Sequence, residues 1–238
     1  MARFGVLQFP GTNCDMDMLR VLRELFHQEA ELVWHRERDL SGYDVIILPG
    51  GFSYGDYLRA GSLARWSPVI EAVADAAAKG RLILGICNGF QILTEAGLLP
   101  GALQRNRHLR YVCDWTYLRV ERDDTPFTSA YQKGQVLRIP ISHGEGNFYA
   151  DASTLDEIEK NGQVVLRYVT PAGEVREEAN PNGSLHHIAG IINKQGNVMG
   201  LMPHPERACE KILGSEDGCG MFASMIQLLT EGRVGHAR

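Results

Sequence analysis

The feature that most constrains what this chain can fold into is the segment at residues 81–91, R-L-I-L-G-I-C-N-G-F-Q. Its first half is a short apolar run, which is typical of a strand buried on both faces of a parallel sheet. The run leads into Gly85-Ile86-Cys87-Asn88-Gly89, which has the spacing of a nucleophile elbow with cysteine in the nucleophile position. Such a sharp turn from strand to helix needs small residues two before and two after the nucleophile, because a Cβ atom there would collide with the neighbouring backbone. The segment therefore predicts Cys87 at the tip of a buried strand.

The same geometry predicts the chemistry of Cys87. A cysteine at the N-terminus of a helix meets unpaired amide N–H groups and the helix dipole, and both favour the thiolate. The backbone N–H of Asn88 would lie beside the reacting carbon and could donate to an oxyanion. The alternative is a small, inert cysteine at a tight turn, and the elbow alone leaves both interpretations open.

Length and composition indicate one globular domain over residues 1–238. Hydrophobic residues make up 44% of the chain and charged residues 22%, and the net charge of -5 gives no reason to expect a nucleic acid or an anionic membrane as partner. The N-terminus leads straight into a predicted strand rather than a signal peptide. Five cysteines without a C-x-x-C pair argue against a disulfide framework or a metal site. We therefore expect a protein of the reducing cytoplasm.

Hydrophobic periodicity predicts alternating strands and helices in the first half of the chain and mainly strands in the second. This pattern predicts an α/β fold with an open, mostly parallel sheet flanked by helices, flavodoxin-like, with additional antiparallel strands in the second half. The expected strands are residues 4–9, 30–34, 45–48, 82–86, 111–120, 136–141, 164–169, 188–193 and 198–202. The expected helices are residues 13–28, 68–79, 88–97, 153–160 (capped by Ser153) and 219–230 (ended by Gly232).

A glycine-rich segment, P-G-G-F-S-Y-G-D-Y-L-R-A-G at residues 49–61, follows the third predicted strand. It lies at the carboxyl end of that strand, where open α/β sheets bind ligands. It is not a phosphate-binding loop, because no Gly-Lys-Ser/Thr follows. Taken alone, a mobile surface loop is the favoured interpretation by about two to one. Beside the elbow, the N–H of Gly51 or Phe52 becomes a candidate second oxyanion donor.

The second candidate feature is Met202-Pro203-His204-Pro205-Glu206, far along the chain. Proline disfavours helical geometry in the residue before it, so we expect His204 and Glu206 in an extended segment, where alternate side chains share one face. A base and the carboxylate that orients it need this arrangement. A lone His-Glu pair is usually an inert surface pair. With an elbow cysteine earlier in the chain, a catalytic role becomes the favoured interpretation.

Together the segments at residues 85–91 and 203–206 resemble the class I, or triad, glutamine amidotransferases. The segments at 48–61, 9–15 and 143–148 narrow the resemblance to the free-standing glutaminase subunits of phosphoribosylformylglycinamidine synthases. The resemblance spans residues 4–207 without departure at a motif position. It implies that Cys87 attacks the side-chain amide of glutamine, with His204 as base and Glu206 as its orienter. It also implies glutamine contacts at Gln91 and near His143.

The resemblance further implies partners. The family reaction consumes ATP, yet no nucleotide site is recognisable in this chain, so ATP and magnesium are expected on a separate synthetase subunit, joined by a small third subunit. Ammonia must reach its acceptor unprotonated, which favours a subunit docked over the site. We expect the loop at 52–61, with Tyr54, Tyr57 and Arg59 exposed, to form part of that interface. The other four cysteines are interpreted as packing residues.

Two other functions fit parts of the sequence. A cysteine hydrolase of the α/β-hydrolase type has the same elbow, but its acid normally precedes the histidine, whereas Glu206 follows His204 by two residues. A non-catalytic flavodoxin-like binding module has no use for Cys87, His204 and Glu206 together.

Overall fold

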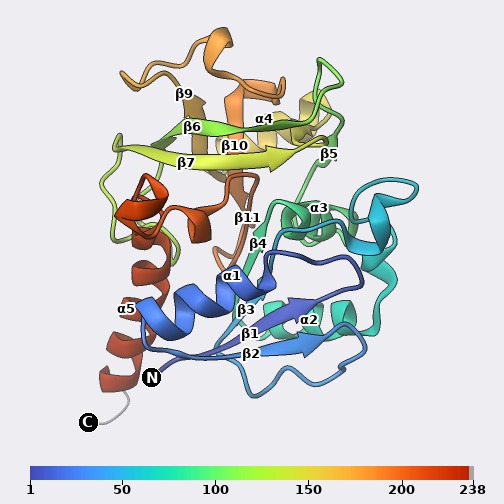
Figure 1. Ribbon diagram of the computed structural model, residues 1–238, viewed down its shortest axis with the longest axis vertical. Helices are drawn as coiled ribbons and strands as arrows, with labels where there is room; N and C mark the ends of the chain where they lie inside the picture. Colours follow the sequence, from blue (N-terminus) through green and yellow to red (C-terminus); the bar gives the residue numbers. More distant parts are fainter. Residues whose placement is uncertain (236–238) are drawn as a thin grey trace.

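The protein is built around one nine-stranded sheet (Figure 1). The structure, a computed structural model, describes residues 1–235, with side chains as far as residue 231. The strand order is β2-β1-β3-β4-β11-β10-β9-β6-β7. The strands are β1 (Arg3–Gln8), β2 (Glu29–Trp34), β3 (Val45–Leu48), β4 (Leu82–Ile86), β6 (Val112–Val120), β7 (Val136–His143), β9 (Val164–Val169), β10 (Ile188–Ile192) and β11 (Val198–Leu201). Two further strands, β5 (Ala102–Gln104) and β8 (Asn147–Tyr149), form a separate antiparallel pair.

The sheet is parallel on one side and antiparallel on the other. Strands β2, β1, β3, β4 and β11 pair in parallel, whereas every pairing from β11 through β10, β9 and β6 to β7 is antiparallel. This arrangement confirms the predicted fold class. β3 and β4 are buried along their whole length, as their continuous apolar sequences predict.

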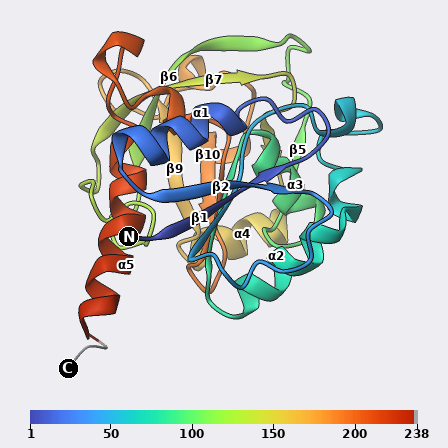
Figure 2. The same cartoon turned by 60° about the horizontal axis from the view of Figure 1, so that its bottom comes forward.

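Five α-helices flank the sheet: α1 (Asp15–Arg20), α2 (Pro68–Ala78), α3 (Asn88–Glu95), α4 (Ala152–Lys160) and α5 (Cys219–Gly235). Helix α1 lies in front of the parallel strands in Figure 1, and α2 and α3 lie behind them; Figure 2 shows the same layers turned by 60°. From β1 the chain passes to β2 on one side, and from β3 it passes to β4 on the other side. Because both crossover connections have the same handedness, their helices lie on opposite faces of the sheet. The carboxyl ends of β1 and β3 thus meet at a switch point, where ligands bind in such sheets.

Several predicted boundaries were wrong. α1 ends at Arg20 and continues as a single π-helical turn, Val21–Leu25, instead of running to residue 28. α4 is capped by Asp151 rather than Ser153, because the Asp151 carboxylate accepts the N–H groups of Ser153 and Thr154, each at 3.0 Å.

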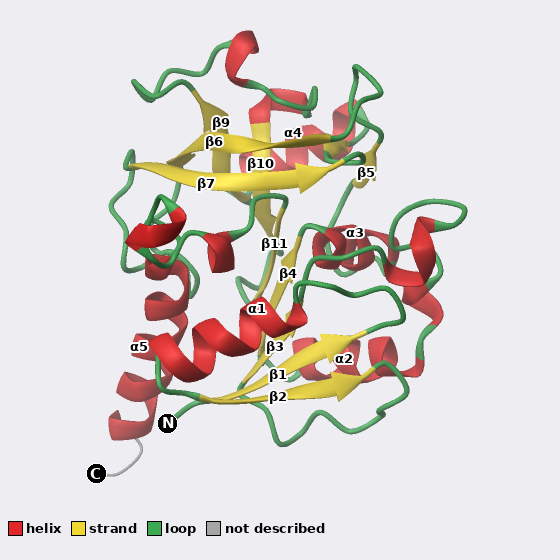
Figure 3. Ribbon diagram, viewed as in Figure 1, coloured by secondary structure: helices red, strands yellow, loops and turns green. Residues whose placement is uncertain are grey.

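The end of the last helix and the smaller sheet also differ from the prediction. α5 runs past Gly232 to Gly235, since a glycine weakens a helix without having to end it. β5 and β8 have three residues each, too few to show alternation in the sequence. Figure 3 colours the strands yellow and the helices red. In the described part of the chain no helix is both long and apolar enough to cross a membrane.

Candidate active site

Cys87 stands between β4 and α3 in a conformation that few residues adopt. It is the N-cap residue of α3, with φ 50° and ψ −105°, and it is buried. Non-glycine residues with positive φ cost about 1–3 kcal/mol and cluster at functional sites. A Cβ on Gly85 would lie 2.7 Å from the backbone of Gly89, and a Cβ on Gly89 would overlap the carbonyl oxygen of Leu48. The two glycines therefore have the steric role that the sequence predicted for them.

Two backbone N–H groups can serve an oxyanion beside Cys87. Asn88 is the first residue of α3, so its N–H has no partner within the helix. In the glycine-rich loop, the N–H of Phe52 donates to the carbonyl of Gly11 at 2.9 Å, whereas the N–H of Gly51 has no hydrogen-bond partner among the described residues. Of the two candidates in that loop, Gly51 is thus the one available as donor.

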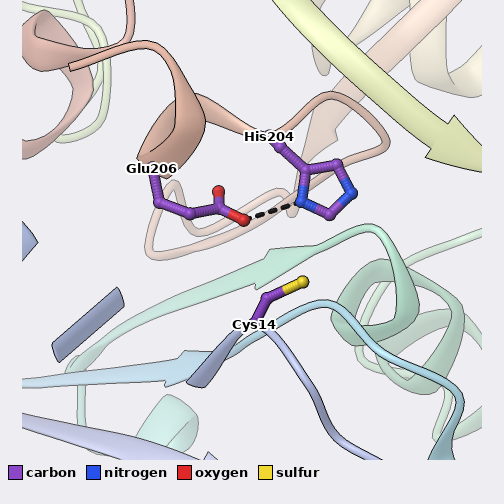
Figure 4. Close-up of side chains that lie close together, drawn as sticks. All are labelled: Cys14, His204 and Glu206. Carbon is purple, nitrogen blue, oxygen red and sulfur yellow. Dashed lines mark hydrogen bonds and ion pairs between the residues drawn. The ribbon is translucent and has the colours of Figure 1, made fainter. Parts of the chain in front are cut away.

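His204 and Glu206 form a buried pair (Figure 4). The His204 Nδ1 atom lies 2.6 Å from the Glu206 Oε1 atom, and both residues are 2% exposed. The backbone N–H of His204 donates to the Pro140 carbonyl on β7, which fixes the segment against the sheet. The expected extended segment is wrong in detail: a 3₁₀ turn begins at Pro205, and that turn brings the two side chains together.

The charges around His204 favour its protonated form. Burial lowers the pKa of His204, but the Glu206 carboxylate and then the Cys87 thiol outweigh burial, so the pKa lies well above its ordinary value. The Nε2 atom is buried and has no hydrogen-bond partner among the described residues. The structure therefore brings Cys87 close to a histidine 117 residues later in the sequence, as a nucleophile and its base require.

A second thiol, Cys14, lies beside this pair, as Figure 4 shows. One donor atom each from Cys14, His204 and Glu206 lie within 4.8 Å of one another. The guanidinium of Arg207 donates to the Cys14 sulfur at 3.0 Å. That positive charge opposes a bound cation, and the His204–Glu206 hydrogen bond already uses two of the donors, so the set is better explained as a hydrogen-bonded cluster than as a metal site.

Cys87 opens into a cavity of about 160 Å³. The cavity is lined by Gly51, Phe52, Asp56, Cys87, Gln91, Tyr111, Ser142, His143, Gly144 and Glu145. Every residue that the sequence predicted for glutamine binding, apart from Asn88, is thus on its wall. Asn88 lies directly behind, and its side-chain amide donates to the Gln91 Oε1 atom at 2.9 Å.

Gln91 and His143 hold the cavity wall in place. The Gln91 Nε2 atom donates to the Glu145 carbonyl at 2.6 Å. The His143 Nδ1 atom lies 3.1 Å from the Asn106 Oδ1 atom, and burial lowers the pKa of His143 to about 3. A neutral histidine with this partner suits a structural contact rather than a second base.

Removing the negative charge of Glu206 should show its effect on the base. In Glu206→Gln the pKa of His204 falls, since the carboxylate is the largest influence raising it, and kcat/KM for glutamine hydrolysis falls by roughly 10²- to 10⁴-fold. The pH–rate profile measures both effects. Glu210→Gln is the matched control, because Glu210 pairs with Arg20 instead. A Glu206→Gln protein with the wild-type profile would show that this carboxylate does not act through His204.

Sequence analysis missed three residues of the site. Cys14 lies within the segment 9–15 but was interpreted as a packing residue, and only the folded chain places it beside His204. Asp56 and Glu145 lie within strings that the sequence singled out, yet nothing local showed that both line one cavity. The signal that could have found them is the placement of both strings at the carboxyl ends of strands.

The fold and the site place the chain in a known class. A family model described as a CobB/CobQ-like glutamine amidotransferase domain matches residues 1–223, and the chain belongs to this family. The hydrolase alternative is not supported, since the matched family and the fold are those of glutamine amidotransferases.

Individual relatives are more specific. The chain is 60% identical over 232 residues to "Phosphoribosylformylglycinamidine synthase subunit PurQ" of Symbiobacterium thermophilum, covering 98% of both chains. It is 56% identical over 234 residues to the subunit of the same name from Moorella thermoacetica, covering 98% of this chain and 99% of that one. Among solved structures, PurLQS from Thermotoga maritima contains a chain that is 46% identical, with a TM-score of 0.86, over 96% of this chain and 100% of that chain. A putative GMP synthase subunit from Thermoplasma acidophilum, 17% identical with a TM-score of 0.66 over 100% of this chain and 98% of that one, shares the fold.

Proposed function

We propose that this chain is the glutaminase subunit of a phosphoribosylformylglycinamidine synthase. It hydrolyses L-glutamine to glutamate and ammonia, and a synthetase subunit uses the ammonia in the ATP-dependent conversion of formylglycinamide ribonucleotide to formylglycinamidine ribonucleotide. The observation that carries the proposal is Cys87 in a strained elbow beside the buried His204–Glu206 pair. The relatives named above, which match nearly the whole chain, support the choice of reaction.

The first half of the reaction forms a thioester. The Cys87 sulfur attacks the side-chain amide carbon of glutamine, and the N–H groups of Gly51 and Asn88 receive the oxyanion. The carbon–nitrogen bond then breaks, and His204, which holds the former thiol proton, protonates the leaving nitrogen so that ammonia departs. Glu206 stabilises the imidazolium by its hydrogen bond to the Nδ1 atom.

The second half releases glutamate. A water molecule enters, His204 takes one of its protons, and the hydroxide attacks the thioester carbon. The carbon–sulfur bond breaks, the sulfur leaves as thiolate, and the imidazolium and thiolate are restored as a pair. The raised pKa of His204 suits this cycle, because the ring can hold the proton that it later gives to the leaving nitrogen.

The remaining parts of the reaction belong to partners. In this proposal ATP and magnesium act on the synthetase subunit, a small third subunit completes the complex, and the assembly works in the cytoplasm. The test is synthesis by the reconstituted complex with glutamine or with ammonium as nitrogen source. Both should support synthesis with this chain present, and only ammonium should do so without it. Equal glutamine-dependent synthesis in the absence of this chain would refute the proposal.

The docking surface is expected near the mouth of the cavity, on the loop at 52–61. The structure changes the set of residues that we expect to contact the partner. Tyr54 is half-buried, with its hydroxyl 3.0 Å from both His35 and Ser67. Arg59 is exposed, as predicted, but its guanidinium is already paired with Glu95 through two hydrogen bonds. Tyr57 and its neighbour Leu58 remain, 74% and 90% exposed. An exposed aromatic and aliphatic pair suits the core of an interface.

We expect the double variant Tyr57→Ala/Leu58→Ala to weaken binding of the synthetase subunit by about tenfold or more, because interface anchors of this kind each contribute over about 1 kcal/mol. Titration calorimetry or a pull-down series measures the loss. Ile212→Ala is the control, since Ile212 is also 90% exposed but belongs to the turn Lys211–Leu213, outside this loop. Unchanged affinity in the double variant would show that the interface lies elsewhere on the chain.

A further inference from the structure

The segment at residues 9–15 carries part of the family resemblance, yet no step of the proposed reaction uses it. In the structure it is fixed to the loop that carries the oxyanion donor Gly51. The backbone N–H groups of Asn13 and Cys14 both donate to the Gly50 carbonyl, at 3.4 and 3.2 Å. The backbone of Cys14 therefore lies directly against the glycine-rich loop.

The Cys14 side chain lies against the catalytic pair (Figure 4). Cys14 is 2% exposed, and its sulfur is within 4.8 Å of one ring nitrogen of His204 and one carboxylate oxygen of Glu206. A Cβ added to Gly50 would lie 2.6 Å from the His204 Cε1 atom and 3.0 Å from the Cys14 sulfur. The imidazole and the sulfur thus pack together on the backbone of Gly50, which has no side chain to separate them.

Two neighbours fix the orientation of this sulfur. Its S–H group donates to the Asn13 Oδ1 atom at 3.2 Å, and the sulfur accepts an N–H of the Arg207 guanidinium at 3.0 Å. The guanidinium is held in turn by Asp17, with 3.3 Å between Nε and Oδ2. Because the thiol proton is directed to Asn13, the imidazole meets the electron-rich side of the sulfur, which is a weak acceptor.

An electron-rich neighbour favours the protonated imidazole. Burial lowers the pKa of His204, and three neighbours together raise it above its ordinary value: Glu206, then Cys87, then Cys14. His143 adds no opposing charge, because burial, and then the charge of His204, lower the pKa of His143 to about 3. The contact with Cys14 therefore affects both the position and the basicity of the ring.

We propose that Cys14 is a positioning residue for glutamine hydrolysis, and that its sulfur keeps the His204 imidazole in the orientation that serves Cys87. This inference rests on the proposed glutaminase function. The sulfur can hold the ring because Asn13 and Arg207 fix the sulfur. Cys14 is not among the residues that line the glutamine cavity, so its loss should change the catalytic rate rather than substrate binding.

The test measures glutamine hydrolysis by Cys14→Ala and Cys14→Ser in the assembled complex, whose assembly shows that each variant is folded. In Cys14→Ala, kcat should fall about 10- to 100-fold because the ring loses its support, while KM changes by less than about twofold. The pKa of His204 in the pH–rate profile should also fall, since the contact with Cys14 raises it.

Two further variants show whether the sulfur acts through its contacts. Cys14→Ser should recover most of the lost kcat, because a hydroxyl can donate to Asn13 and accept from Arg207 as the thiol does. Cys113→Ala, the same change at an exposed cysteine, is the control and should keep the wild-type kcat and pH profile.

A lower kcat and a lower pKa in Cys14→Ala, with recovery in Cys14→Ser, support the inference. An unchanged kcat in Cys14→Ala overturns it, because the ring then needs no support from the sulfur. A loss of kcat with the wild-type pH profile and no recovery in Cys14→Ser also overturns it, since Cys14 then only fills space. If the wild-type complex releases no glutamate from glutamine, the proposed function itself fails, and this outcome is distinct from the others.

Discussion

Cys87→Ser is expected to lower kcat/KM for glutamine hydrolysis by about 10³-fold or more. Sulfur is a stronger nucleophile than a hydroxyl oxygen, and the elbow places the Cys87 sulfur at the N-terminus of α3. A serine hydroxyl in the same place is far less acidic, and a base tuned to a thiol does not compensate. Release of glutamate by the purified complex measures the loss.

Two controls separate a chemical effect from a folding defect. Cys113→Ser changes the same atom at an exposed cysteine and should keep full activity. In the Cys87→Ser complex, synthesis from ammonium should continue, because free ammonia bypasses this chain. A Cys87→Ser protein that still hydrolyses glutamine at a substantial rate would contradict the mechanism.

Gly89→Ala is expected to destabilise the protein by about 2–4 kcal/mol or to prevent folding. The added Cβ would overlap the carbonyl oxygen of Leu48, the last residue of β3. Relief requires α3 to move away from the centre of the parallel sheet, where packing is dense. Denaturant unfolding of wild type and variant gives the difference.

Gly42→Ala is the matched control for this change. A Cβ there meets only the flexible end of the Arg3 side chain, at 3.3 Å, so the stability should change by less than about 1 kcal/mol. If Gly89→Ala is as stable as Gly42→Ala, the close contact between elbow and β3 does not constrain the fold as described.

The parts of the fold that the sequence predicted are those with a local cause. β3 and β4 are short apolar runs, and their burial follows from their sequence. The elbow was predictable because Gly85 and Gly89 are required by contacts within a few residues and with the adjacent strand. The pairing of His204 with Glu206 was predictable for a similar reason, although the turn that produces it is 3₁₀ rather than extended.

The parts that the sequence did not predict depend on contacts between distant segments. Cys14 follows β1 and His204 follows β11, and the two side chains meet because both strands end at the same edge of the sheet. Hydrophobic periodicity in the sequence carries no information about this contact. The exposure of Tyr54 was predicted wrongly because its hydroxyl finds His35 and Ser67, which are remote in sequence. Asp56 and Glu145 are far apart in the sequence, and only the fold shows that they line one cavity.

The measurement that bears most directly on the central claim is the mass of the Cys87 peptide during turnover. The complex is mixed with glutamine, quenched in acid within the first turnovers and digested. The account predicts one glutamyl group on Cys87 in the wild type and none in Cys87→Ser. Glutamate release from a wild-type complex whose Cys87 is never modified, or a glutamyl group on another residue, would contradict it.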